Sequence, residues 1–236
     1  MSNGQGIILV VDDDPLISHS IGYALRQEGY GVVVAANGQL ALEQLSLHSP
    51  SLVVLDVGLP DISGVEVCRR IRRQSTVPIM FLTAHQDEVD KVVALDAGGD
   101  EYVVKPVGIA ELAARVRALL RRSSAGSPPT DPPSKVFRVG DLSLDADAHR
   151  VEVRGEEVPL TPREYDLLQL LVSNAGKALS RQQILDSVWG PDWFGEENVV
   201  EVFVRQLRRK IEEAPERPRM IETVRGVGYR FEAKGS

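Results

Sequence analysis

The sequence has a single cysteine, few histidines and no long apolar run. One thiol, Cys68, cannot form an internal disulfide, and the four histidines are too scattered for the spacing of a zinc site: His19, His48, His85 and His149. Because no apolar stretch reaches about 18 residues, we expect no membrane-spanning helix. The residues before Ile7 include no Lys or Arg, so we also expect no secretory signal. These absences favour a cytoplasmic protein without a structural metal.

Acidic and basic residues are unevenly distributed along the 236 residues. The whole chain carries a formal net charge of −7, which by itself argues against binding to nucleic acid. Between Arg205 and Arg230, however, eight basic residues stand against four acidic ones, a local excess of four positive charges. A local basic patch, rather than the charge of the whole chain, indicates contact with a phosphate backbone. The carboxyl-terminal region is therefore a candidate nucleic-acid interface.

A proline-rich segment divides the chain near its middle. Residues 123–134 read SSAGSPPTDPPS and hold four of the 14 prolines. Consecutive prolines favour extended, unpaired backbone, which makes this segment a semi-rigid tether. We therefore predict a first domain over residues 1–122, a tether over 123–134 and a second domain over 135–236.

Short apolar runs alternate with amphipathic helical stretches in the first domain. Five runs rich in β-branched residues have the length of buried parallel strands, namely Ile7–Val11, Val32–Ala35, Leu52–Leu55, Ile79–Leu82 and Tyr102–Val104. Five strands alternating with five helices predict an α/β fold with a doubly wound, five-stranded parallel sheet. In such sheets the functional site lies at the carboxyl ends of the strands, where the strand order reverses.

The second domain has a different pattern. Residues 137–160 form short alternating segments separated by glycine and aspartate, which predicts a small antiparallel sheet. Three helices follow: the first two begin with capping boxes, at Thr161–Glu164 and Ser180–Gln183, and the third is expected over 198–213. The chain closes with two strands around a glycine-containing turn, over residues 220–232. This order predicts an α+β winged helix-turn-helix domain.

Polar side chains follow the predicted strands of the first domain at their carboxyl ends. Asp12 and Asp13 come directly after the first strand, and Asp56 after the third. Thr83 and Lys105 follow the fourth and fifth strands. Clustered carboxylates repel one another unless a hard cation such as Mg²⁺ binds them. A hydroxyl and an ammonium beside that metal suit phosphoryl transfer, with Asp56 as the nucleophile that becomes an aspartyl phosphate.

This combination of residues resembles the receiver domain of two-component response regulators, which has a flavodoxin-like fold. The matching motifs are Ile8–Pro15, Leu55–Pro60, Leu82–Ala84 and Tyr102–Pro106. The resemblance implies that Asp56 accepts a phosphoryl group from a partner, a sensor histidine kinase. It also implies that Mg²⁺ is bound by Asp13, Asp56 and the backbone carbonyl of Gly58, with Asp12 alongside.

The same resemblance gives roles to the other strand-end residues. Thr83 and Tyr102 are expected to form a switch pair, and Lys105 to contact the phosphoryl group, before a cis peptide at Pro106. Gly58 departs from the methionine common at that position in this subfamily. Because a backbone carbonyl is the ligand there, we expect metal binding to survive this difference.

Charged residues of both signs gather between Lys91 and Arg117. By themselves they are compatible with a solvated face. The stretch nevertheless resembles the dimerisation face of OmpR/PhoB-type regulators. That resemblance implies three ion pairs across a two-fold axis: Lys91 with Glu111, Asp100 or Glu101 with Arg115, and Asp96 with Arg117. We expect phosphorylation to favour this homodimer by shifting a pre-existing equilibrium.

The third helix of the second domain combines an apolar side with a basic cluster. Its later turns carry Arg205, Gln206, Arg208, Arg209 and Lys210. A basic amphipathic helix fits the DNA major groove, where Arg and Gln donate to base edges or phosphates. A helix that is merely solvated, or that contacts an acidic partner, is the alternative interpretation. Arg225, in the turn of the terminal hairpin, is placed to enter the minor groove or to contact phosphate.

Residues 137–232 resemble the winged-helix effector domain of the OmpR/PhoB family. The matching motifs are Leu160–Leu168, Leu179–Arg181, Val188–Gly190, Val204–Ile211 and Thr223–Arg230. The resemblance implies that double-stranded promoter DNA is contacted by Val202, Arg205, Gln206, Arg208 and Arg209. It also implies that the loop over 190–197 contacts RNA polymerase, although a plain loop needs no such partner. Phe203 and Gln206 depart from the usual histidine and a frequent arginine, so no base preference is carried over.

Two other functions compete with a phosphorylation-controlled transcription regulator. A small-molecule phosphatase that forms an aspartyl phosphate needs an acid two residues after the nucleophile, where this chain has Gly58. A phosphate-independent regulator is disfavoured because Asp13, Asp56, Thr83 and Lys105 are all present. The sequence therefore favours the regulator. Its only enzymatic chemistry is expected to be Mg²⁺-dependent self-phosphorylation of Asp56 and hydrolysis of the acyl phosphate.

Overall fold

The computed structural model describes residues 6–84, 88–123, 136–190 and 198–232. The chain divides into two compact units, Met1–Ser124 and Ala125–Ser236, at a point inside the predicted tether. Most of the tether lies outside the described residues. Within the described part of the chain, no helix is both long and apolar enough to span a membrane.

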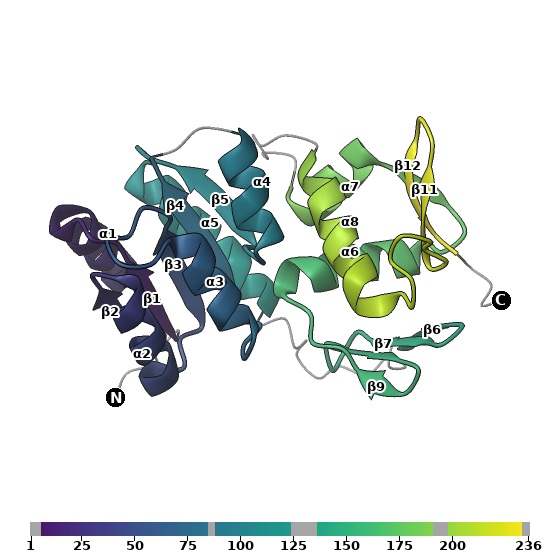
Figure 1. The fold of residues 1–236 in the computed structure, drawn as a ribbon, viewed down its shortest axis with the longest axis horizontal. Helices are drawn as coiled ribbons and strands as arrows, with labels where there is room; N and C mark the ends of the chain where they lie inside the picture. The colour runs from purple at the N-terminus through teal and green to yellow at the C-terminus, as the bar shows by residue number, and fades with distance from the viewer. Residues whose placement is uncertain (1–5, 85–87, 124–135, 191–197, 233–236) are drawn as a thin grey trace. The chain divides into compact units, whose positions relative to one another are not determined.

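A five-stranded parallel sheet forms the middle layer of the first unit (Figure 1). Its strands are β1 (Ile7–Val11), β2 (Gly31–Ala35), β3 (Leu52–Asp56), β4 (Ile79–Thr83) and β5 (Glu101–Val104). Their order is β2-β1-β3-β4-β5, which confirms the predicted doubly wound α/β fold. β3 and β4 are buried along their whole length, because helices cover both faces of the sheet. This burial explains their continuous apolar sequences.

Five helices cover the two faces of this sheet: α1 (Pro15–Gln27), α2 (Gly38–His48), α3 (Gly64–Arg72), α4 (Glu88–Asp96) and α5 (Ile109–Ser123). α1 and α5 pack together on one face, and α2, α3 and α4 follow one another on the other (Figure 1). Side chains alternate between the faces along each strand, so Ile8 and Val10 belong to the core beneath α1 and α5. With both faces filled by apolar side chains, the strand ends become the place for polar groups.

Asp100 lies directly before β5 and is fully buried. One of its carboxylate oxygens accepts hydrogen bonds from Arg72 Nη2 at 2.8 Å and from Ile79 N at 2.9 Å. The Arg72 side chain, only 12% exposed, donates to backbone carbonyls as well. Asp100 therefore joins α3 to the start of β4. The expectation that Asp100 pairs with Arg115 of a second chain is wrong, because its carboxylate is buried and used inside the domain. The alternative partner, Glu101, is itself only 3% exposed and accepts a hydrogen bond from Arg115 of its own chain.

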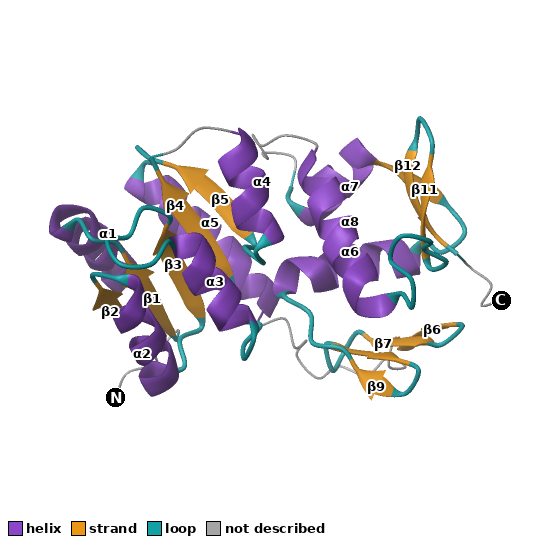
Figure 2. Cartoon of the chain, in the orientation of Figure 1, coloured by secondary structure: helices purple, strands orange, loops and turns teal. Residues whose placement is uncertain are grey.

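The second unit begins with an antiparallel sheet of β6 (Val136–Val139), β7 (Leu142–Asp145), β8 (Arg150–Val153) and β9 (Glu156–Glu157). Three helices follow, α6 (Pro162–Ser173), α7 (Arg181–Val188) and α8 (Asn198–Ile211). The hairpin of β11 (Ile221–Val224) and β12 (Gly228–Phe231) closes the unit (Figure 2). These elements confirm the predicted winged helix-turn-helix domain.

Both predicted capping boxes are present in the second unit. At α6, Thr161 N donates to Glu164 Oε2 at 2.8 Å, and Glu164 N donates to Thr161 Oγ1 at 3.5 Å. At α7, Ser180 N donates to Gln183 Oε1 at 2.8 Å, and Gln183 N donates to Ser180 Oγ at 3.1 Å. Each box satisfies amides that the first helical turn leaves without a partner, which is why the two helices begin where the sequence predicts.

Two details of the second unit differ from the prediction. α8 ends at Ile211, two residues earlier than expected. A short strand, β10 (Ala178–Ser180), pairs with β12 and converts the expected two-stranded hairpin into a three-stranded sheet. β10 is too short to show a period in its sequence, so only its pairing with a distant segment defines it as a strand.

Replacing Asp100 by alanine should destabilise the first unit strongly. The change leaves the Arg72 guanidinium buried without its charged partner, and breaking a buried pair costs about 3–5 kcal/mol. Arg117→Ala is the matched control, because Arg117 pairs with Glu28 at 2.6 Å on the surface, where a pair contributes about 0–1 kcal/mol. Urea denaturation of both variants measures the free energy of unfolding. Equal losses in the two variants would contradict the buried role of Asp100.

Candidate functional site

Three carboxylates meet at the carboxyl ends of β1 and β3. Asp12 and Asp13 follow β1, and Asp56 is the last residue of the adjacent strand β3. One oxygen from each carboxylate lies within 4.8 Å of the others. Asp12 and Asp56 are 3% and 8% exposed, whereas Asp13 is exposed to solvent. The strand order reverses between β1 and β3, which is where a doubly wound sheet places its site.

The Lys105 ammonium joins two of these carboxylates from the end of β5. Its Nζ lies 2.7 Å from Asp12 Oδ2 and 2.8 Å from Asp56 Oδ2. Burial opposes the charge on Lys105, but the hydrogen bonds to both carboxylates outweigh burial and raise the pKa of the ammonium. Burial also raises the pKa of Asp12, an effect that the bond from Lys105 reduces. The three carboxylates are thus only partly neutralised by the single positive charge of Lys105, so the site can accept a further cation.

Backbone amides hold the second oxygen of each buried carboxylate. Asp14 N donates to Asp12 Oδ1 at 3.0 Å, and Gly58 N donates to Asp56 Oδ1 at 3.3 Å. Each carboxylate is therefore oriented by an amide at one oxygen and by Lys105 at the other. Ionised carboxylates accept but do not donate, and a cluster of them held in this way fits a hard divalent cation such as Mg²⁺.

The two predicted switch residues lie on the neighbouring strands. In the sheet register, Asp56 pairs with Leu82 of β4. Thr83 is the next residue and the last of β4, and it is fully buried. Lys105 N donates to the Thr83 carbonyl at 2.6 Å, and the peptide bond after Lys105 is cis, as predicted. Tyr102 pairs with Phe81, two residues before Thr83. The side chains of Tyr102 and Thr83 therefore lie on the same face of the sheet. The site thus draws on four strand ends, with Tyr102 farther back.

Two glycines shape the loop after Asp56. Gly58 is exposed, and a Cβ atom there would meet nothing within 4 Å in the described structure. At Gly64, the first residue of α3, a Cβ atom would overlap the carbonyl oxygen of Asp56. Sequence analysis missed Gly64, because its requirement for glycine arises from the close approach of α3 to the backbone of β3.

The residues of the predicted dimer face lie on three consecutive elements. Lys91 and Asp96 belong to α4, Glu101 to β5, and the others to α5, namely Glu111, Arg115 and Arg117. Within the chain, Arg115 donates to Glu101 Oε1 at 2.7 Å and to Glu111 Oε1 at 2.8 Å. Arg117 pairs with Glu28, outside this face. These ion pairs belong to one chain, and pairing across a two-fold axis stays a prediction.

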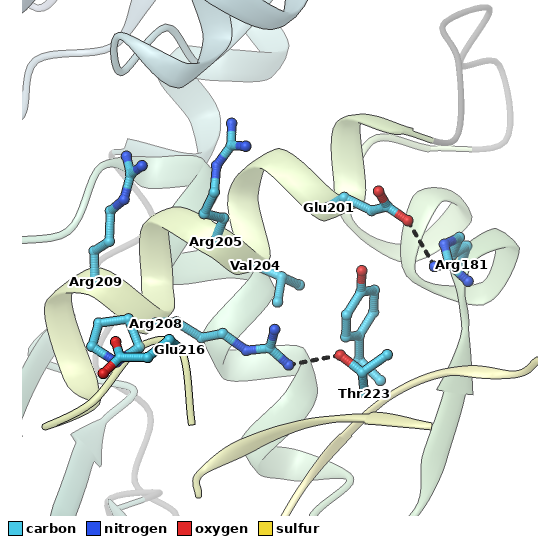
Figure 3. A pocket seen from close by; sticks show the side chains of 10 residues that line it. Arg181, Glu201, Val204, Arg205, Arg208, Arg209, Glu216 and Thr223 are labelled. Carbon is cyan, nitrogen blue, oxygen red and sulfur yellow. Dashed lines mark hydrogen bonds and ion pairs between the residues drawn. The ribbon is translucent and has the colours of Figure 1, made fainter. Parts of the chain in front are cut away.

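The basic residues of α8 divide between two roles. Arg205 and Arg209 are exposed, and Figure 3 shows both side chains extending from the same side of the helix. Arg208 instead points to the hairpin, where it donates to the Ile221 carbonyl at 2.6 and 3.0 Å and to Thr223 Oγ1 at 2.9 Å. Burial lowers the pKa of its guanidinium. The assignment of Arg208 as a direct DNA contact is therefore corrected, because its guanidinium anchors α8 to β11.

Two further residues assigned to DNA are not exposed. Val202 and Gln206 are only 4% and 7% exposed. They share one helical stripe with Lys210, whose ammonium donates to Glu164 Oε2 at 2.6 Å. Because Val202 and Gln206 are buried within the chain, their assignment as direct DNA contacts is corrected. Arg225, in the turn between β11 and β12, is exposed as expected.

An aromatic ring in the second unit contacts two guanidinium groups and was missed by the sequence analysis. The centre of the Tyr229 ring lies 5.4 Å from Arg181 Cζ and 5.8 Å from Arg208 Cζ. Arg181 also pairs with Glu201 of α8 at 2.7 Å. Figure 3 shows these side chains lining one pocket together with Arg205. Stacking of cations on the ring fixes α7, α8 and the hairpin relative to one another.

The two units match two known protein families. Residues 8–117 match the family described as "Response regulator receiver domain". Residues 155–231 match the family described as "Transcriptional regulatory protein, C terminal". The first match contains the whole acidic site, and the second contains every element from α6 to β12.

Relatives align along nearly the whole chain. The transcriptional regulatory protein AfsQ1 of Streptomyces coelicolor is 46% identical over 95% of this chain and 97% of its own. The DNA-binding response regulator MtrA of Mycolicibacterium smegmatis is 43% identical over 94% of this chain and 95% of its own. The structure of DrrB, an OmpR/PhoB homologue from Thermotoga maritima, is 34% identical with a TM-score of 0.50 over 96% of this chain and 98% of that one. The chain therefore belongs to the OmpR/PhoB family of two-component response regulators, with a receiver domain and a DNA-binding domain.

Proposed function

We propose that this regulator is switched by transfer of a phosphoryl group from a sensor histidine kinase to Asp56. The observation that carries the proposal is the bridge of Lys105 between Asp12 and Asp56, with a third carboxylate beside it. Mg²⁺ would be bound by Asp12, Asp13, Asp56 and the Gly58 carbonyl. When bound, it supplies positive charge to the oxygens of the phosphoryl group.

Asp56 is the nucleophile in this proposal. One of its oxygens bonds to phosphorus while the bond from phosphorus to the donor breaks, and that electron pair leaves with the imidazole of the kinase. The Lys105 ammonium, which is 2.8 Å from Asp56 Oδ2, would stabilise charge on the transferred oxygens, and the Thr83 hydroxyl would assist it. Attack of water on phosphorus later releases phosphate and restores the carboxylate. We propose no other enzymatic activity.

The second domain carries the output of the switch. Arg205 and Arg209 on α8, with Arg225 in the hairpin turn, are exposed cations suited to a groove and to the phosphates of double-stranded promoter DNA. Phosphorylation would favour a homodimer through α4, β5 and α5. The loop over 190–197, most of which lies outside the described residues, would contact RNA polymerase. A cytoplasmic location belongs to this proposal, because the protein acts on chromosomal DNA.

Reaction with acetyl phosphate and Mg²⁺ tests the receiver. Intact-mass measurement should show one added phosphoryl group on the native chain and none on Asp56→Asn, because the amide is a poor nucleophile. Lys105→Ala keeps the nucleophile but loses the cation, so its rate should fall about 100-fold. Chelation of Mg²⁺ should abolish the adduct. An equal adduct on Asp56→Asn, or none on the native chain, would contradict the proposal.

Sedimentation velocity tests the dimer. The native chain should shift from monomer toward dimer after acetyl phosphate treatment. Arg115→Ala should reduce the shift, because Arg115 is a cation of the α4, β5 and α5 face that contacts carboxylates from both β5 and α5. Arg69→Ala is the control, since Arg69 lies on α3 and its side chain is 53% exposed. A fully phosphorylated chain that remains monomeric would count against phosphorylation-driven dimerisation.

Binding to a DNA sequence selected from a random pool tests the output surface. Arg205→Ala and Arg209→Ala should each weaken binding by about 1–3 kcal/mol, and loss of a phosphate contact should reduce the salt dependence of binding by about one charge. Gln206→Ala is the control, because Gln206 is nearly buried and uncharged. Fluorescence anisotropy at several salt concentrations gives both quantities. If Gln206→Ala weakens binding more than either arginine variant, the assignment of the DNA-contacting side is wrong.

A further inference from the structure

The loop between β3 and α3, residues 57–63, borders the acidic site. It contains Gly58, whose amide donates to Asp56 Oδ1 at 3.3 Å. The residue that follows the loop is Gly64, whose amide donates to the Val57 carbonyl at 3.0 Å. These contacts tie the loop to its own two ends. A further contact holds its outer part to a different helix.

Asp61 makes that contact with the first turn of α2. Gly38 N donates to Asp61 Oδ1 at 2.8 Å, and Gln39 N donates to Asp61 Oδ2 at 2.9 Å. Both carboxylate oxygens are therefore used, across 23 and 22 residues of sequence. The bonds from the Gly38 and Gln39 amides lower the pKa of Asp61, so the carboxylate is ionised at neutral pH. The amides of a helix start also favour a negative charge there.

The start of α2 does not depend on Asp61. Asn37 already caps this helix, because its Oδ1 accepts from Leu40 N at 2.8 Å. Asp61 is exposed, so water could satisfy the amides of Gly38 and Gln39 in its absence. The main effect of the Asp61 side chain is therefore to hold the loop of residues 57–63 in place.

Packing next to Asp61 makes the position of the loop specific. A Cβ atom at Gly38 would lie 2.5 Å from Ile62 Cγ1 and 2.7 Å from Val67 Cγ2. The loop and α2 are thus in close contact at Gly38. The two bonds from Asp61 keep the loop seated against the helix.

We propose that Asp61 is a positioning residue for the acidic site. By holding the loop against α2, it fixes Gly58, and through the Gly58 amide it fixes the orientation of Asp56. The inference rests on the proposed phosphoacceptor function, in which Asp56 and the Gly58 carbonyl bind Mg²⁺. Without this attachment, the loop would have to become ordered when Mg²⁺ binds. The conformational entropy lost in that step would weaken the affinity of the site for Mg²⁺.

The test compares Asp61→Ala with Asn37→Ala in the full chain. Both variants lose side-chain bonds to the first turn of α2, but only Asp61→Ala releases the loop. Calorimetric titration with Mg²⁺ alone should give an affinity about tenfold weaker for Asp61→Ala, and within about twofold of native for Asn37→Ala. The Mg²⁺ concentration that half-saturates phosphorylation by acetyl phosphate should rise by the same factor in Asp61→Ala, with little change in the rate at saturating Mg²⁺.

Two further measurements separate positioning from folding. Asp61→Asn keeps one acceptor oxygen, so its Mg²⁺ affinity should lie between those of Asp61→Ala and the native chain, and it replaces Asp61→Ala if that variant does not fold. Hydrogen exchange at the Gly58 amide should be faster in Asp61→Ala than in Asn37→Ala.

Equal Mg²⁺ affinities for Asp61→Ala and Asn37→Ala would overturn the proposal, because Asp61 would then act as a helix cap alone. Native affinity in Asp61→Ala would overturn it as well. Failure of the proposed function gives a different result: the native chain would bind Mg²⁺ but form no adduct on Asp56. The comparison of metal affinities would still decide the role of Asp61.

Discussion

One ammonium group held between two carboxylates organises the receiver domain. Lys105 lies 93 residues from Asp12 and 49 residues from Asp56, and its side chain reaches both from the end of β5. β4 separates β5 from β3, so the bridge passes the strand that ends at Thr83. Two buried carboxylates side by side repel each other, and Lys105 offsets that repulsion. In the proposed phosphoryl transfer, the same cation would meet the negative charge of the incoming group.

The DNA-binding domain also depends on cations that are engaged inside it. Arg208 joins α8 to β11, and Arg181 joins α7 to α8 through Glu201. Tyr229 lies against both guanidinium groups. These contacts hold the helix and the hairpin in one orientation. In the proposed function, the exposed arginines of α8 would be presented from this fixed arrangement, which would lower the entropy cost of binding DNA.

Local features were the ones that the sequence predicted well. The first strand has the predicted bounds, Ile7–Val11, because a buried parallel strand reads as an apolar run. Both capping boxes involve residues three positions apart, so their bonds could be predicted from the chain alone. β10 was missed because three residues carry no period, and its only sign is its pairing with β12. Gly64 was missed because its neighbour is the backbone of another element.

The sequence by itself determined which chemical groups end the strands of the receiver, since apolar runs and the polar residues after them are local features of the chain. Only the tertiary structure decided which charged residues are used internally. Asp100 and Arg208 are residue types that are usually exposed on protein surfaces. The fold nevertheless buries Asp100 against Arg72, and it bonds Arg208 to the backbone carbonyl of Ile221. Asp61 likewise gains its partners from a helix more than 20 residues away. The physical reason is that the sequence around a charged residue does not show which group it will pair with. The partner is set by the packing of segments that are distant in the chain.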